Sequence, residues 1–207
     1  MSVEATIFIV DDDADVRDSL RALLESARFT VADYESARAF LAAPAPSGGC
    51  MIADIRMPDM DGLELQEELA RRNVGIPVIV VTGHGDVPLA VRAMKAGAVD
   101  FIEKPYDDEV MLASVRRALA AGTPARAQAQ ADPAIMDLVS SLTPREREVL
   151  EHLIAGRPNK VIAYELGISP RTVEIHRAHL MEKMRAKSLP ELVRVALAAG
   201  VVPADGR

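Results

Sequence analysis

The sequence predicts an α/β fold: a doubly wound (βα)5 parallel-sheet domain followed by a small all-α domain. Two observations support this prediction. Over the first 120 residues, five short apolar runs alternate with helical patterns, which is typical of a parallel sheet with helices on both faces. After a stretch rich in Ala, Gln and Pro, only helical periodicity continues. The predicted boundaries are therefore 1–120 for the first domain, 121–134 for a linker that could be helical, and 135–207 for the second domain.

The elements of the first domain follow from hydrophobic periodicity. Val16, Leu20, Leu23 and Leu24, for example, recur at helical spacing. Right-handed crossovers between the strands then leave few topologies. We expect strands near 5–10, 29–33, 50–54, 76–81 and 99–103, and helices near 15–27, 36–43, 62–72, 86–97 and 107–120.

Composition narrows the class of protein. The 207 residues are 49% hydrophobic and suit two modest domains. The single cysteine, Cys50, excludes an internal disulfide and favours a reducing compartment. The apolar runs are too short to span a membrane, and the N-terminus has no signal-peptide pattern. We therefore expect a soluble, cytoplasmic protein that makes no membrane contact.

Charge is unevenly divided between the two halves. Residues 1–121 hold 12 basic and 21 acidic residues, whereas residues 122–207 hold 12 and 10. An acidic first half would be repelled by nucleic acid, so only the second half could approach it.

Polar side chains follow four of the apolar runs in the first domain. Asp11 and Asp12 end the first run, Asp54 ends the third, and Thr82 and Lys104 follow the last two. The carboxyl ends of parallel strands are where ligands bind, so these groups should meet at one edge. Carboxylates so close repel each other unless a cation neutralises them, and an all-oxygen site suits Mg²⁺, or Mn²⁺ in its place.

The same groups suit phosphoryl transfer. Asp54 could attack phosphorus and form an acyl phosphate, while Lys104 and Thr82 could bind phosphate oxygens. We also expect the Lys104–Pro105 peptide to be cis, because a defined lysine direction is needed. The alternatives are a surface lysine, a threonine that merely ends a strand, and acids that only cap a helix, with Asp13 the expected cap.

The sequence of the second domain predicts a helix-turn-helix. Thr143 and Glu146 form a capping box for a helix that stops at Gly156. A short helix follows at 158–166. Ser169 then caps a helix with Pro170 in its first turn, running to about Met184, and a last helix spans roughly 189–199.

The helix after Ser169 has one apolar and one polar stripe at about 100° per residue. We expect the apolar stripe to pack inward; it comprises Val173, His176, Leu180 and Met184. The opposite stripe should face a major groove and read bases; it comprises Arg171, Glu174, Ala178 and Arg185, with Ile175 at its edge. Candidates for phosphate contacts are Lys160, Ser169, Thr172, Arg177 and His179. The alternative is an ordinary solvated helix face.

Taken together, these residues resemble two-component response regulators of the FixJ type. The first domain resembles a receiver domain over 1–120, through the acid pair, Asp54, Thr82 and Lys104-Pro105, and the segment 82–91 resembles the nitrogen-fixation regulators closely. Residues 140–200 resemble a LuxR/NarL-type helix-turn-helix domain, through Leu142–Glu146 and Asn159–Ala163.

The resemblance implies specific roles. Asp54 would be the phosphorylation site, and Asp11, Asp12, Asp54 and the backbone carbonyl of Arg56 would hold the metal. Thr82 and Phe101 would be switch residues, and Phe101 has no hydroxyl, so any switch there would act through packing. His84, in the loop beside the pocket, is expected to be solvated. The implied phosphodonor is a sensor histidine kinase, a FixL-like haem oxygen sensor.

The expected function is that of a regulator, not an enzyme, with at most self-phosphorylation from small donors and self-dephosphorylation. Phosphorylation would promote homodimerisation and binding to promoter DNA, and would activate transcription by RNA polymerase, on nitrogen-fixation or microaerobic genes. The alternative is a Mg-dependent phosphatase with an Asp nucleophile. Such an enzyme needs a second acid to protonate the leaving group and a substrate cap, and the short 55–62 loop leaves little room for a cap. A dinucleotide-binding domain is excluded, because three Asp follow the first strand in place of a glycine motif.

Overall fold

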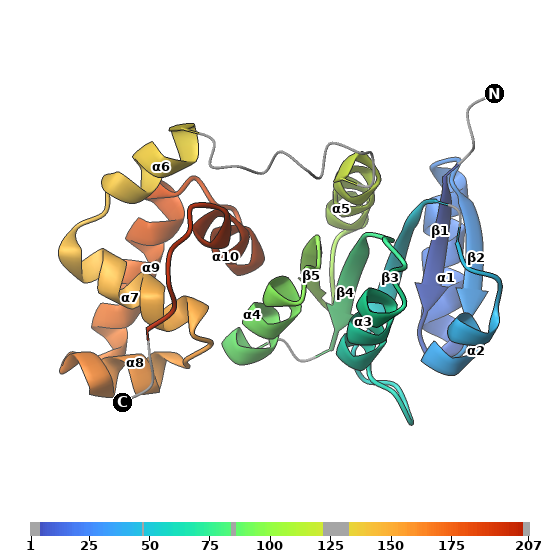
Figure 1. Ribbon diagram of the computed structural model, residues 1–207, viewed down its shortest axis with the longest axis horizontal. Coiled ribbons are helices and arrows are strands. Elements are labelled where there is room, and N and C mark those ends of the chain that lie inside the picture. The colour runs from blue at the N-terminus through green and yellow to red at the C-terminus, as the bar shows by residue number, and fades with distance from the viewer. Residues whose placement is uncertain (1–4, 47, 84–85, 122–132, 205–207) are drawn as a thin grey trace. The chain divides into compact units, whose positions relative to one another are not determined.

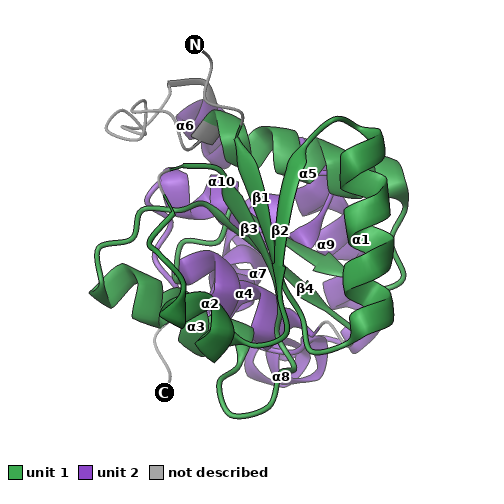
Figure 2. Cartoon of the chain, turned by 90° about the vertical axis from the view of Figure 1, so that its right-hand side faces the viewer, with its two compact units in different colours: residues 1–84, 96–126 green, residues 85–95, 127–207 purple. Residues whose placement is uncertain are grey.

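The computed structural model describes residues 5–46, 48–83, 86–121 and 133–204. The chain divides into two compact units, residues 1–84 with 96–126, and residues 85–95 with 127–207 (Figure 2). His84 and nearly all of the expected linker lie outside the described residues. The predicted domain boundaries therefore stay predictions.

The first unit contains a five-stranded, all-parallel sheet in the order β2-β1-β3-β4-β5 (Figure 1). Its strands are β1 (Thr6–Val10), β2 (Thr30–Tyr34), β3 (Cys50–Asp54), β4 (Val78–Thr82) and β5 (Asp100–Glu103). The predicted doubly wound fold is confirmed, with each strand within two residues of its expected bounds. The strand order reverses between β1 and β3, and ligands of such folds bind at this switch point.

Helices α1 (Ala14–Ser26) and α5 (Asp108–Ala121) cover one face of this sheet, whereas α2 (Ala37–Ala42) and α3 (Gly62–Arg71) lie on the other (Figure 2). Leu20 and Leu24 of α1 and Met111 and Val115 of α5 pack on the apolar side chains of the strands. All residues of β3 and β4 are buried, as expected for central strands covered on both faces.

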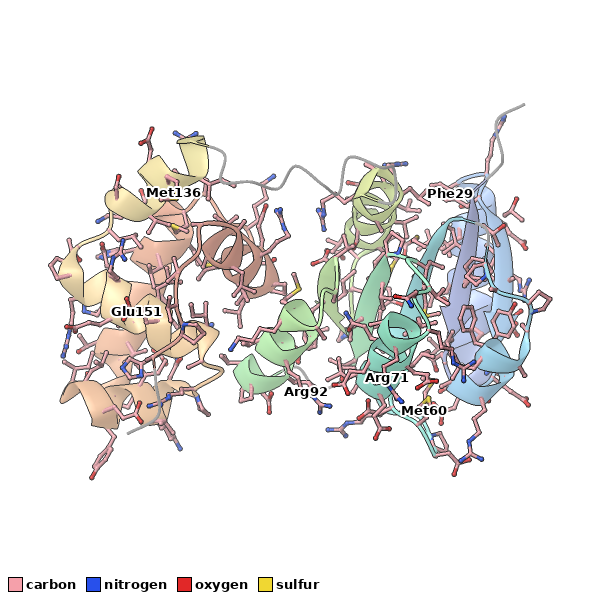
Figure 3. The ribbon with its side chains drawn as sticks, viewed as in Figure 1. Phe29, Met60, Arg71, Arg92, Met136 and Glu151 are labelled. Carbon is pink, nitrogen blue, oxygen red and sulfur yellow. The ribbon has the colours of Figure 1, made fainter. Side chains whose placement is uncertain are left out.

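The second unit, as the chain divides, holds α4 (Val87–Lys95) together with the C-terminal helices. The latter are α6 (Pro133–Ser140), α7 (Pro144–Ile154), α8 (Asn159–Leu166), α9 (Pro170–Lys183) and α10 (Leu189–Ala198). The predicted all-helical architecture is confirmed. Leu150, Leu153, Ile162 and Leu180 are fully buried, whereas Met136 of α6 is 47% exposed (Figure 3).

Sequence features explain where these helices begin. Thr143 and Glu146 form the predicted capping box of α7, and Ser169 caps α9 by accepting a hydrogen bond from the amide of Thr172. Gly167 ends α8 in the left-handed conformation, with φ of 64°, a conformation that glycine adopts without the strain of a Cβ. The turn between α8 and α9 is therefore encoded locally.

Candidate functional site

Two buried carboxylates lie at the carboxyl edge of the sheet and share one ammonium group. Asp11 follows β1 and Asp54 ends β3; they are 3% and 7% exposed. The Nζ atom of Lys104 lies 2.8 Å from Oδ2 of Asp11 and 2.7 Å from Oδ1 of Asp54. The structure therefore brings together three of the side chains predicted to meet there, from three separate segments of the chain.

Local backbone contacts hold Asp54. Its Oδ2 atom accepts a hydrogen bond of 2.6 Å from the amide of Arg56, while the Arg56 side chain is exposed. Gly62, the first residue of α3, donates its amide to the carbonyl of Ile55 at 3.1 Å. A Cβ atom on Gly62 would lie 2.3 Å from the carbonyl oxygen of Asp54, so the close approach of α3 to the end of β3 requires glycine.

Lys104 is fixed at both its backbone and its side chain. Its amide donates to the carbonyl of Thr82 at 2.7 Å, and the Lys104–Pro105 peptide is cis, as predicted. Burial by itself would lower the pKa of Lys104, but the hydrogen bonds to Asp11 and Asp54 outweigh it and raise that pKa above its usual value. The ammonium is therefore held charged between the two acids.

The remaining predicted residues of this pocket differ in burial. Thr82 and Phe101 are buried, whereas Asp12 is exposed. Asp13 caps α1 by accepting hydrogen bonds from the amides of Asp15 and Val16, as expected. Across the parts of the chain that the structure describes, no three acidic, His or Cys side chains gather as a metal site. The three-acid magnesium site thus stays a prediction, with Asp12 outside the Asp11–Lys104–Asp54 cluster.

Sequence reasoning missed Arg17. This residue of α1 donates from Nη1 to the backbone carbonyl of Asp11 at 2.8 Å, and its Nε lies 3.4 Å from Oδ2 of Asp33 in β2. Arg21, one turn along α1, also pairs with Asp33. Two features of the sequence could have indicated this contact. Arg17 lies early in the helix that follows the acid pair, and Asp33 is a charged residue inside a predicted strand.

The helix-turn-helix of the second unit comprises α8, the Gly167 turn and α9. Val173 and Leu180 of α9 are fully buried, Met184 is 1% exposed, and His176 is half-buried. The predicted inward stripe is therefore confirmed. Arg177 crosses from α9 to α8, where its Nη1 donates to Oδ1 of Asn159 at 2.8 Å.

The opposite side of α9 is open. The predicted base-reading residues are all exposed: Arg171, Glu174, Ile175 and Ala178. Ile175 is 50% exposed although it is apolar. Arg185 does not belong to this stripe, contrary to the prediction: α9 ends at Lys183, and Arg185 has a φ of 53°. Because the backbone has left the helix there, the helical spacing no longer places its side chain.

The predicted phosphate-contacting residues fall into two groups. Lys160, Ser169 and His179 are exposed, whereas Thr172 and Arg177 are half-buried. The Ser169 and Thr172 hydroxyl oxygens lie 2.8 Å apart, and burial lowers the pKa of Arg177 below its usual value. Arg177 therefore serves the packing of α8 on α9 in addition to any role in binding.

Comparisons with known proteins match both domains. Residues 7–116 match the response regulator receiver domain, and residues 140–196 match the bacterial regulatory proteins of the luxR family. No helix in the described segments is both long and apolar enough to cross a bilayer.

Full-length relatives extend these matches. The chain is 54% identical over 200 residues to the transcriptional regulatory protein FixJ of Azorhizobium caulinodans, covering 96% of this chain and 95% of that one. It is 53% identical to FixJ of Rhizobium meliloti, covering 96% and 98%. The crystal structure of full-length FixJ from B. japonicum matches with a TM-score of 0.57 and 49% identity, over 97% of this chain and 100% of that one.

A receiver domain joined to a luxR-type domain defines a two-component response regulator, a class of regulators and not of classical enzymes. The chain belongs to this family and, within it, to the FixJ-type transcriptional regulators. Family membership leaves no support for the phosphatase alternative.

Proposed function

We propose that the protein is switched by phosphorylation of Asp54 and that the switched form binds promoter DNA as a homodimer. The observation that carries this proposal is the buried pair of carboxylates, Asp11 and Asp54, held by the single ammonium of Lys104. Buried acids of this kind are costly unless a cation compensates them. Two carboxylates buried at this free-energy cost, with one lysine between them, are typical of a functional site.

The chemistry assigned to Asp54 is acyl-phosphate formation. An oxygen of its carboxylate forms a bond to phosphorus while the bond from phosphorus to the donor breaks, leaving the donor with the electron pair. The donor is a phosphohistidine of a sensor kinase, or a small molecule such as acetyl phosphate. Lys104, already 2.7 Å from Asp54, moves its hydrogen bond from the carboxylate to a phosphoryl oxygen, and Thr82 binds another.

The residues present fit a Mg²⁺ or Mn²⁺ ion. The carboxylates of Asp11 and Asp54 meet at Lys104 on one edge of the sheet. Asp12, the next residue in the chain after Asp11, adds an exposed carboxylate, and carboxylate oxygens are the ligands that these ions prefer. These acids and the carbonyl of Arg56 would hold the ion. When bound, it would offset negative charge on the transferring oxygens.

The DNA-binding step uses the exposed stripe of α9. In this proposal Arg171 pairs with guanine, Glu174 accepts from cytosine, and Ile175 and Ala178 contact thymine methyl groups. The exposure of all four side chains supports it. One copy would bind weakly because residues 122–207 carry little excess positive charge. Two copies on two half-sites supply the missing affinity, which makes dimerisation an effective switch.

The proposed partners follow from similarity. Relatives of 49–54% identity carry the name transcriptional regulatory protein FixJ. We assign this chain a FixL-like haem oxygen-sensing histidine kinase as phosphodonor, RNA polymerase as the recipient of activation, and nitrogen-fixation or microaerobic genes as targets.

Intact-protein mass spectrometry tests the first step. Wild type incubated with acetyl phosphate and Mg²⁺ should gain one phosphoryl group, and Asp54→Asn should gain none. Asp59→Asn is a matched control, because Asp59 lies in the next loop with an exposed side chain and a φ of 66° that Asn tolerates. Equal labelling of wild type and Asp54→Asn would show that another residue is the acceptor.

A further inference from the structure

The acid pair at the end of β1 is held by a contact that the pocket chemistry does not itself require. The Nη1 atom of Arg17 donates to the backbone carbonyl oxygen of Asp11 at 2.8 Å. That carbonyl belongs to the peptide joining Asp11 to Asp12. The hydrogen bond therefore restrains the plane of this peptide, and with it the position of the Asp12 Cα, from which the Asp12 side chain begins.

Arg17 is itself held from the far side. Its Nε lies 3.4 Å from Oδ2 of Asp33, a residue of β2 whose other oxygen pairs with Arg21. The side chains of Arg17 and Asp33 are 15% and 27% exposed, so this arrangement is largely sheltered from water. The guanidinium thus spans β2 and the end of β1 with two of its nitrogens in fixed geometry.

Every other polar atom of the Asp11 backbone and carboxylate is also engaged. Its amide donates to the carbonyl of Tyr34 at 3.2 Å. Its Oδ1 accepts from the amide of Asp13 at 2.9 Å, and its Oδ2 accepts from Lys104 at 2.8 Å. When a cation displaces Lys104 from Asp11, the contact from Arg17 is the one that still orients the Asp11–Asp12 peptide from outside the pocket.

We infer that Arg17, aimed by Asp33, is a positioning residue that presents Asp11 and Asp12 to the divalent cation. The inference rests on the proposed function, because it concerns the same metal site. Contacts that orient metal ligands from behind typically change metal affinity by tenfold or more when they are lost. Arg17 never touches the ion, and acts only through the peptide that it holds.

The test separates geometry from charge by exchanging Arg for Lys. Arg17→Lys keeps the positive charge but loses the planar fork that reaches Asp11 and Asp33 together. Arg21→Lys is the matched control, since Arg21 lies one turn along α1 and pairs with the same Asp33. Both variants of the full chain keep the net charge, so electrostatic attraction of the cation is unchanged.

Two measurements are made on wild type and both variants. Isothermal titration calorimetry with Mg²⁺ alone gives the affinity, and the initial rate of acetyl phosphate labelling at varied Mg²⁺ gives the half-saturating concentration and the limiting rate. We expect Arg17→Lys to weaken Mg²⁺ binding roughly tenfold and to raise the half-saturating concentration similarly. Its limiting rate should stay within about twofold of wild type, as should all values for Arg21→Lys.

Two results would overturn the inference: unchanged Mg²⁺ affinity in Arg17→Lys, or an equal loss in Arg21→Lys, which would indicate a general effect on α1. Failure of the proposed function itself has a different signature, namely wild type that neither binds Mg²⁺ nor becomes labelled. Should Arg17→Lys fold poorly, Asp33→Asn provides a second variant. It removes the anchor of Arg17 and should also weaken Mg²⁺ binding selectively.

Discussion

Lys104 lies 2.7 Å from the carboxylate of Asp54, although the two residues are 50 positions apart in the sequence. The contact places the expected phosphate-binding ammonium on the expected phosphate acceptor. Lys104 also contacts Asp11 at 2.8 Å, so one cation compensates two buried acids. Any divalent ion entering this pocket must compete with it.

This relationship predicts the behaviour of Lys104→Met. Two buried carboxylates would lose their common partner, and we expect the free energy of unfolding to fall by about 1–3 kcal/mol, reduced from the cost at a fully buried pair because Lys104 is 24% exposed. Urea unfolding followed by circular dichroism measures this loss. Mg²⁺ should stabilise Lys104→Met more than wild type, because the ion no longer competes with an ammonium.

The exposed Lys95→Met provides the control; it should stay within about 0.5 kcal/mol of wild type. Equal stability of Lys104→Met and Lys95→Met, with no added benefit from Mg²⁺, would contradict the pairing.

Gly62 should not tolerate a side chain. The Cβ of Gly62→Ala would fall 2.3 Å from the carbonyl oxygen of Asp54, so α3 or the end of β3 must move. We expect a loss of about 1–3 kcal/mol and slower labelling of Asp54. Gly75→Ala has nothing within 4 Å of its new Cβ, and should leave both stability and labelling rate unchanged. If the two variants behave alike, the close approach at Gly62 is not required.

The stability of the helix-turn-helix unit should fall in acid through Glu146. Burial would raise the pKa of Glu146, but hydrogen bonds from Lys183, at 2.7 Å, and Thr143 outweigh burial and lower it to about 2. Because the pKa is depressed in the folded state, unfolded chains bind the proton first as pH falls. The contribution is complete above a pH of about 4.5, the ordinary pKa of this carboxyl, and is lost as pH falls toward 2.

Glu146→Gln tests this reasoning, since it removes the titrating group at nearly constant shape. Unfolding midpoints measured between pH 2 and 7 should fall less steeply below pH 4.5 in the variant than in wild type. Parallel curves would show that Glu146 does not contribute to the acid response.

Variants of α9 should distinguish residues that contact DNA from residues that pack the helix. We expect Arg171→Ala to weaken binding to a specific promoter fragment by about 1–3 kcal/mol, roughly 5- to 150-fold, without loss of stability, because Arg171 is exposed. Arg177→Ala should lower stability as well, since it removes the 2.8 Å hydrogen bond to Asn159. Fluorescence anisotropy with labelled DNA and thermal unfolding distinguish them. If Arg171→Ala instead lowered stability and left the affinity for DNA unchanged, Arg171 would not be a base-reading residue.

Much of the first unit was predictable because its signals are local. Strands covered on both faces produce continuous apolar runs. The residues at their carboxyl ends, Asp11, Asp54 and Lys104, are brought to one edge by the parallel topology. Caps such as Asp13, Thr143 and Ser169 likewise act on amides within three residues. Such features depend little on the rest of the fold.

What the sequence did not reveal depends on distant contacts or on backbone torsions. Arg17 faces the Asp11 carbonyl only once α1 packs beside β1 and β2, and no periodicity marks a residue by the backbone atom it binds. Arg185 was misplaced because helical spacing was extended past the point where α9 ends. The end of α9 is set by a left-handed φ in a residue other than glycine, which has no sequence signature.

We expect phosphorylation of Asp54 to control DNA binding, and this is tested by measuring the affinity for one promoter fragment with and without acetyl phosphate and Mg²⁺. For wild type, we expect affinity to rise roughly tenfold or more, accompanied by a shift from monomer to dimer in sedimentation velocity. Asp54→Asn should show neither change. Identical affinity and sedimentation of wild type before and after phosphorylation would show that phosphorylation of Asp54 does not control DNA binding.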